Sequence, residues 1–183
     1  PFAVTTESQT VEARALIVAT GATAKKLDLP SGERLWNRGI SACAVCDGAL
    51  PIFRGKVLAV VGGGDTACEE ATYLTHFASK VLLIHRRDEL RGSKIMQDRA
   101  RANDKITFVL NAVVTEVVGT SEAGVTAVRL KDTVTGEERL HPTQGVFVAI
   151  GHRPNTEVVR GQLDMDEAGY VVTVPGTTRT SVE

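Results

Sequence analysis

Short apolar runs alternate with amphipathic stretches through the middle of the chain, which is the pattern that a βαβ fold produces. Uninterrupted runs of Val, Leu, Ile and Phe predict strands that are covered on both faces, as in a parallel sheet. These strands are expected at 57–61, 81–84, 106–110 and 146–150. Apolar residues at helical spacing predict helices at about 66–79 and about 88–102, the second burying Leu90, Ile95 and Met96.

Three short segments in which apolar and polar residues alternate lie between the last two of these strands. They are 113–118, 125–131 and 137–141. Thr135 and Gly136 predict a tight turn between the second and the third segment. The sequence therefore predicts an α/β fold, a Rossmann-like domain with a parallel sheet and βαβ units, in which the final crossover is a three-stranded β-meander.

The N-terminal part of the chain has a different pattern. Two strands are expected at 2–6 and 10–19, on either side of a polar turn. The second strand ends with the apolar run 15–19, which Thr20 and Gly21 follow, as expected for a strand buried in a core. Residues 22–39 are polar and contain Pro30, so we interpret them as a linker.

Composition narrows the classes of function. The chain has 183 residues, 43% of them hydrophobic, and a formal net charge of −1. It has enough apolar residues for a core, no overall field that would attract nucleic acid or an anionic membrane, and no apolar run near the roughly 18 residues of a membrane span. The odd number of cysteines favours a reducing compartment. Because the chain begins at Pro1 without a methionine, we expect it to be a segment of a longer protein.

A glycine-rich turn follows the strand at 57–61 and opens the next helix. Gly62, Gly64 and Ala67 fit the dinucleotide-binding fingerprint, with alanine at its third small position. Gly62 permits the tight turn, Gly64 lets a pyrophosphate approach the backbone, and Ala67 lets the helix pack close to the strand. A glycine turn without a ligand is the alternative, but the position between a strand and a helix favours a dinucleotide.

The residues after the second strand of such a unit select the nucleotide. An acidic residue there binds the ribose 2′-hydroxyl of NAD, whereas this chain has His85, Arg86 and Arg87, with Arg91 one helical turn later. Arginine presents a planar fork of donors that suits a phosphate dianion. The sequence therefore favours NADP over NAD, and a solvated basic patch is the alternative.

Cys43 and Cys46 form a CxxC pair that Asp47 follows directly. Such a pair is either half of a zinc site, an inert buried pair or a redox centre. A structural zinc site needs four ligands, and the remaining cysteine, Cys68, is isolated and is predicted to be a core residue. A redox dithiol with a nearby proton acceptor is the favoured hypothesis. The usual link between nicotinamide and a disulfide is a flavin, and the flavin's own glycine fingerprint does not occur in these residues.

Taken together, five motifs resemble those of NADPH-dependent thioredoxin reductases of the low-molecular-weight type. Their sequences are similar to those of the plant, algal and cyanobacterial branch. The motifs are Cys43–Gly48, Val60–Thr66 with Glu69-Glu70, His85–Arg91, Ser93–Arg99 and Ala149–Asn155. The resemblance implies a homodimeric flavoenzyme with NADPH and FAD as cofactors and thioredoxin as the protein substrate. It divides the chain into the end of one FAD-domain portion (1–27), an NADPH-binding domain (28–152) and the start of a second FAD-domain portion (153–183).

The resemblance also implies roles for single residues. Cys46 would face the flavin, Cys43 would attack the disulfide of thioredoxin, and Asp47 would act as general acid and base. The residues implied in cofactor binding are Gly62, Gly63, Gly64, Asp65 and Thr66 for the pyrophosphate, His85, Arg86, Arg87 and Arg91 for the 2′-phosphate, Ile150 and Gly151 for the nicotinamide end, and Thr20 and Gly21 near the flavin. No metal is expected. The segments at about 27–38 and 152–155 would be hinges for a rotation of the NADPH domain.

Two other functions stay open at this level. One is a flavoprotein reductase that serves a different disulfide carrier, such as a peroxiredoxin system, and the other is a non-catalytic NADP-binding redox module. The expected location is the cytoplasm, or the plastid stroma for a plant or algal source, with no nucleic-acid or membrane partner.

Overall fold

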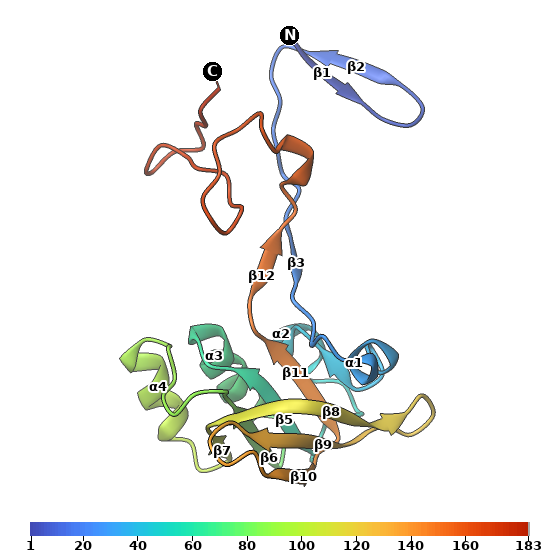
Figure 1. Cartoon of the computed structure of the whole chain (residues 1–183), viewed down its shortest axis with the longest axis vertical. Helices are drawn as coiled ribbons and strands as arrows, with labels where there is room; N and C mark the ends of the chain where they lie inside the picture. Colours follow the sequence, from blue (N-terminus) through green and yellow to red (C-terminus); the bar gives the residue numbers. More distant parts are fainter. Residues whose placement is uncertain (183) are drawn as a thin grey trace. The chain divides into compact units, whose positions relative to one another are not determined.

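The structure, a computed structural model, describes residues 1–182 and divides into two compact units (Figure 1). Residues 24–152 form one unit, and residues 1–23 together with the chain from Arg153 onward form the other. The chain passes between the units at β3 (Ala22–Ala24) and again at β12 (His152–Pro154), and these two strands pair with each other.

A five-stranded parallel sheet is the centre of the unit 24–152. Its strands, in spatial order, are β4 (Ile40–Ser41), β11 (Gly145–Ala149), β5 (Val57–Gly62), β6 (Lys80–Ile84) and β7 (Ile106–Val109). The sheet confirms the predicted α/β fold. Four of the five strands follow from the sequence pattern, whereas β4, with two residues, is too short to show one.

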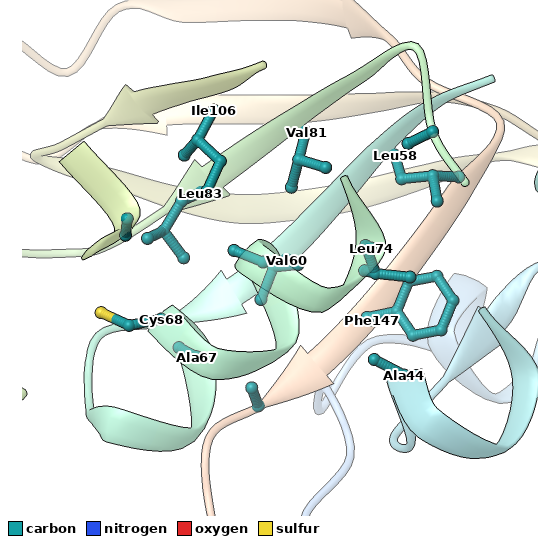
Figure 2. Close-up of a cluster of buried hydrophobic side chains, with 14 of the residues drawn as sticks. Ala44, Leu58, Val60, Ala67, Cys68, Leu74, Val81, Leu83, Ile106 and Phe147 are labelled. Atoms are coloured by element: carbon teal, nitrogen blue, oxygen red, sulfur yellow. The ribbon is translucent and has the colours of Figure 1, made fainter. Parts of the chain in front are cut away.

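Both faces of the sheet are buried, which explains why its strands are continuous apolar runs. On β5, Leu58 and Val60 point into one apolar cluster, while Ala59 points into a second cluster on the opposite face. Helices cover the first face (Figure 2). Residues of the meander, such as Val117 and Val128, cover the second. Each fully buried Val or Leu stabilises the fold by about 1.5–3 kcal/mol.

The two longer helices are shorter than the sequence predicts. Helix α3 (Asp65–Leu74) ends five residues early, because the Thr75 hydroxyl donates to the Thr72 carbonyl (2.6 Å) and the chain turns. Helix α4 (Lys94–Arg101) begins six residues late, because the preceding loop bonds to the glycine turn instead. Ile95, expected in the core, is 60% exposed, so that expectation is wrong. No helix among residues 1–182 has the length and apolarity needed to cross a bilayer.

The crossover between β7 and β11 is the predicted meander. Strands β8 (Ala112–Thr120), β9 (Gly124–Asp132) and β10 (Glu138–Pro142) pair antiparallel. The turn before β10 closes where the Asp132 carboxylate accepts the backbone N–H groups of Val134 and Thr135, both at 2.8 Å. The predicted three-stranded crossover is therefore confirmed.

The expectation of a linker at 22–39 is wrong. Besides β3, this stretch contains the short helix α1 (Pro30–Arg34), which Pro30 opens. Proline is tolerated there because the first N–H groups of a helix have no intrahelical partner. The Ser31 hydroxyl accepts the N–H of Val117 at 3.0 Å, and Leu35 is fully buried. The segment is therefore packed into the core of its unit.

The other unit begins with a hairpin of β1 (Phe2–Thr5) and β2 (Thr10–Ala13). The second strand was expected to continue to residue 19, but it ends at Ala13, and Ile17 is 90% exposed. A buried strand needs a hydrogen-bonding neighbour on its edge, and no segment in the described part of the chain pairs with residues 14–19. A single turn of 3₁₀ helix at Glu157–Val159 follows β12.

Candidate functional site

The CxxC pair lies on the short helix α2 (Ala44–Asp47), directly after β4. Cys43 and Cys46 form a disulfide, with their Cα atoms 5.3 Å apart, and the N–H of Cys46 donates to the Cys43 sulfur (3.1 Å). Cys43 is half-buried and Cys46 is exposed. The pair is therefore not buried, and its two sulfurs are bound to each other.

Ser41 holds the carboxylate of Asp47 beside this disulfide turn. Its hydroxyl donates to Asp47 Oδ2 at 2.6 Å and accepts the N–H of Cys43 at 3.0 Å. The N–H of Asp47 in turn donates to the carbonyl of Cys43 at 3.1 Å. The proton acceptor expected from the sequence is thus fixed within the turn that carries both sulfurs. Sequence reasoning missed Ser41, which belongs to the two-residue strand that has no pattern of its own.

Helix α2 packs directly on α3, the helix of the dinucleotide motif. A Cβ atom at Gly48 would lie 2.7 Å from Leu74 Cδ2 and 2.6 Å from the Ala44 carbonyl oxygen, so only glycine fits there. Ala44 is fully buried in the same cluster as Leu74 and Phe147 (Figure 2). The redox pair and the dinucleotide motif are therefore two parts of one packed assembly.

The glycine turn is shaped by close contacts on one side and open space on the other. A Cβ at Gly62 would lie 2.3 Å from the Ala149 carbonyl oxygen and 2.9 Å from the Ala67 Cβ, and a Cβ at Gly63 would lie 2.2 Å from the His85 ring. A Cβ added at Gly64, in contrast, would meet nothing within 4 Å. No side chain caps the helix that starts here, so its first N–H groups face that space without a side-chain partner in the described chain. Such an end suits a phosphate.

The arginine loop is attached to this turn by backbone hydrogen bonds. The Gly63 carbonyl accepts the N–H of Arg91 (2.6 Å) and of Gly92 (3.0 Å). Asp65 Oδ1 accepts the N–H of Ser93 at 2.5 Å. Asp65, expected among the cofactor-binding residues, therefore links the glycine turn to the basic loop. Its contact with a cofactor stays a prediction.

Three arginines of this loop are free to bind an anion. The side chains of Arg86, Arg87 and Arg91 are exposed, and none forms an ion pair with another residue between positions 1 and 182. The carbonyl of Arg86 accepts the Thr133 hydroxyl at 3.3 Å, and that of Arg87 accepts the N–H of Asn111 at 3.0 Å. The backbone is fixed while the guanidinium groups remain available.

His85 differs from these arginines. It is 5% exposed, its ring fills the space beneath Gly63, and its Nε2 atom has no hydrogen-bond partner in the described residues. Burial lowers the pKa of His85, and the charges of Arg91 and Arg87 lower it further. The imidazole is therefore neutral at physiological pH and supports the turn from behind. The 2′-phosphate contact expected for it stays a prediction.

The remaining expected site residues lie in both units. Ile150 and Gly151 follow β11, in which Ala149 pairs with Gly62 of β5, so they lie at the same sheet edge as the glycine turn. Thr20 and Gly21 belong to the other unit, where both carbonyls accept hydrogen bonds from Asn155, at 3.1 Å and 3.0 Å. The nicotinamide and flavin contacts of these residues stay predictions.

Comparison with known proteins shows the family of the chain. The family model of the pyridine nucleotide-disulphide oxidoreductases matches residues 2–183. The chain therefore belongs to this family.

Within the family, the chain is similar to thioredoxin reductases, which confirms the resemblance found in its motifs. It is 53% identical to thioredoxin reductase 1 of Saccharomyces cerevisiae over 100% of this chain and 58% of that protein. It is 50% identical to NADPH-dependent thioredoxin reductase 3 of Arabidopsis thaliana over 100% of this chain and 35% of that protein. The solved structure of Lactococcus lactis thioredoxin reductase superposes with a TM-score of 0.86 at 39% identity, covering 98% of this chain and 58% of that one. The chain thus spans about half the length of the relatives it matches.

Proposed function

We propose that the protein to which this chain belongs reduces the disulfide of thioredoxin with electrons from NADPH, and that residues 24–152 carry both the nucleotide site and the redox cysteines. The observation that carries the proposal is the direct packing of α2, with its accessible disulfide, on α3, the helix that the open glycine turn precedes. The similarity to thioredoxin reductases supports the same assignment.

The residues at the glycine turn fit NADPH. The space beside Gly64 and the first N–H groups of α3 suit the pyrophosphate, and the unpaired guanidinium groups of Arg86, Arg87 and Arg91 suit the 2′-phosphate. Gly63, Asp65 and Thr66 would complete the turn around the phosphates. Ile150 and Gly151, at the same sheet edge, would lie toward the nicotinamide.

The second cofactor we propose is FAD, which would supply the electron transfer that links a hydride donor to a disulfide. Thr20 and Gly21 would lie near it. Thr20 and Gly21 are both exposed in this structure. We therefore derive the chemistry only for the cysteines.

Once Cys43 and Cys46 are reduced, the Cys43 thiolate attacks one sulfur of the thioredoxin disulfide. A mixed disulfide forms, and the other thioredoxin sulfur leaves as a thiolate. Cys46 then attacks the Cys43 sulfur, which closes the Cys43–Cys46 disulfide and releases the second thioredoxin sulfur. Asp47 takes the proton from the Cys46 thiol before this second attack and gives it to the thioredoxin sulfur that left as a thiolate, which its fixed position next to Cys46 allows.

The wider organisation is proposed on the resemblance. Residues 28–152 would be the NADPH-binding domain and the flanking segments parts of an FAD domain, in a homodimer that rotates its NADPH domain during turnover. A rotation is supported by the division of the structure into two units, with two strand crossings between them. The compartment would be the cytoplasm or the plastid stroma.

A Cys43→Ser variant of the full-length protein tests the proposal. We expect thioredoxin reduction to fall at least about a thousandfold, because the attacking sulfur is lost, while bleaching of the flavin by NADPH continues. Loss of bleaching as well would contradict the assigned roles. Wild-type turnover with a peroxiredoxin-type carrier but not with thioredoxin would favour the other disulfide carrier, and a colourless protein that binds NADPH would favour a non-catalytic module.

A further inference from the structure

Glu70 is an ionisable residue in the contact between α2 and α3. It lies on α3 one turn before Leu74, whose Cδ2 atom faces Gly48 of α2, and it is half-buried. Its Oε2 atom is buried and has no hydrogen-bond partner within residues 1–182. A carboxyl group at the place where the redox helix meets the nucleotide helix is unusual, because a buried unpaired polar atom costs stability.

The surroundings of Glu70 make its charge sensitive to the redox helix. Burial raises the pKa of Glu70 to about 7, the backbone N–H of Ala44 opposes this rise, and the negative charge of Glu69 adds to it. Ala44 is the residue directly after Cys43. The group that stabilises the carboxylate is therefore part of the turn that carries the reactive sulfurs.

Other charges near Glu70 are few. On α2, the Asp47 carboxylate is turned to the Ser41 hydroxyl. The strands under α3, which are β5, β6 and β11, contain a single ionisable residue, the exposed Lys80. Helix α4 also packs on α3, and the charge of its Arg101 acts on Cys68. Reduction of the neutral disulfide to a thiol and a thiolate thus adds a negative charge to the turn whose Ala44 N–H acts on Glu70.

We propose that Glu70 is a positioning residue for the redox pair, and that its carboxyl group binds a proton when the Cys43–Cys46 disulfide is reduced and releases this proton when the disulfide re-forms. The proposal rests on the proposed function only in taking these two cysteines as the redox pair. When an external dithiol reduces the disulfide, the S–S bond receives two electrons and breaks. One sulfur keeps a proton from the reductant, the other remains a thiolate, and the second proton of the reductant passes to the Glu70 carboxylate.

Linkage gives the sign of the effect. In acid, Glu70 is protonated in both redox states and has no influence on the equilibrium. In alkali, the carboxylate is charged and disfavours the thiolate beside it, so the wild-type disulfide is harder to reduce than that of a neutral variant. Wild type and Glu70→Gln should therefore agree at low pH and diverge as the pH rises through 7.

The experiment is a redox titration of the full-length protein. Oxidised wild type and Glu70→Gln are equilibrated with mixtures of reduced and oxidised dithiothreitol at about pH 5.5 and about pH 8.5, quenched in acid, alkylated, and analysed by mass spectrometry of the peptide that contains Cys43 and Cys46. At the lower pH we expect equal equilibrium constants within about twofold. At the higher pH we expect reduction of the wild type to be about five- to tenfold less favourable, and tenfold equals about 30 mV for this two-electron couple.

A matched control and a second variant make the outcome decisive. Glu69→Gln removes the same charge one residue away, on an exposed side chain, and is expected to shift the equilibrium by less than about twofold at either pH. Glu70→Asp keeps the carboxyl group and should keep the pH-dependent divergence from Glu70→Gln. A wild-type to Glu70→Gln ratio that does not change with pH, or an equal shift in Glu69→Gln, overturns the proposal. If the full-length protein does not reduce thioredoxin, the proposed substrate is wrong, but the result of this redox titration does not depend on that.

Discussion

The glycine turn and the CxxC helix are neighbours in one packed unit, yet the contacts at their reactive groups differ. The turn is fixed by steric contact, since Gly62 and Gly63 leave no room for a single added carbon. The CxxC helix is also packed tightly, at Ala44 and Gly48, but the Ser41 hydroxyl holds its Asp47 carboxylate by exchangeable hydrogen bonds, and the backbone N–H of Ala44 acts on the Glu70 carboxyl group. A nucleotide site has to present the same shape in every cycle, whereas a redox helix changes its charge in every cycle, and polar contacts can respond to that change.

The largest effect that tests this contrast is expected from adding one methyl group to the turn. Gly63→Ala places a carbon 2.2 Å from the buried His85 ring, and we expect a loss of about 3 kcal/mol or more in unfolding free energy together with loss of NADPH binding. Gly64→Ala is the matched control, because the added carbon would meet nothing within 4 Å and the φ of −93° at this position suits alanine. It should change stability by less than about 0.5 kcal/mol and still weaken NADPH binding. Chemical denaturation and fluorescence titration measure both, and equal stability of the two variants would contradict a steric origin.

The next effect concerns the arginines that the turn positions. Replacing Arg86 and Arg87 by alanine should raise the KM for NADPH about a hundredfold, because each charged hydrogen bond to a phosphate is worth about 1.5–3 kcal/mol. The KM for NADH should stay within about twofold. Arg139→Ala, which removes an exposed arginine of the meander, serves as the control in the same steady-state assay. If both cofactors weaken equally, the arginines do not read the 2′-phosphate.

The smallest effect is expected at the polar contacts of the redox helix. Ser41→Ala removes the hydroxyl that donates to Asp47 and accepts from Cys43, leaving a 4% exposed position without both bonds. We expect a loss of about 1–2 kcal/mol in stability and a several-fold slower reduction of thioredoxin, with unchanged NADPH binding. Ser93→Ala is the control, because the Ser93 hydroxyl makes no capping hydrogen bond. A loss of NADPH binding in Ser41→Ala would show that the two sites do not differ as described.

Much of the fold and part of the site follow from the sequence. The βαβ order, the parallel sheet and the meander are encoded in local periodicity, which depends only on whether a segment is covered on one face or on two. The glycine turn, the arginine loop and the CxxC pair are likewise recognisable, because each chemistry requires particular residue types at fixed short spacing. The expected strand at 10–19 fails because its edge needs a partner that local pattern cannot guarantee.

Only the tertiary structure decides what the isolated motifs do to one another. It seats His85 beneath Gly63 rather than in solvent, and it uses Asp65 to attach the arginine loop. It also bonds Ser41 to Asp47 and places Glu70 where the backbone N–H of Ala44 acts on it. Except for the bonds of Ser41, these contacts join residues more than 20 positions apart in the chain, and such contacts depend on packing geometry, which no local pattern contains. Residue type and spacing therefore determined which chemistry is present, and packing determined which charges and protons act on it.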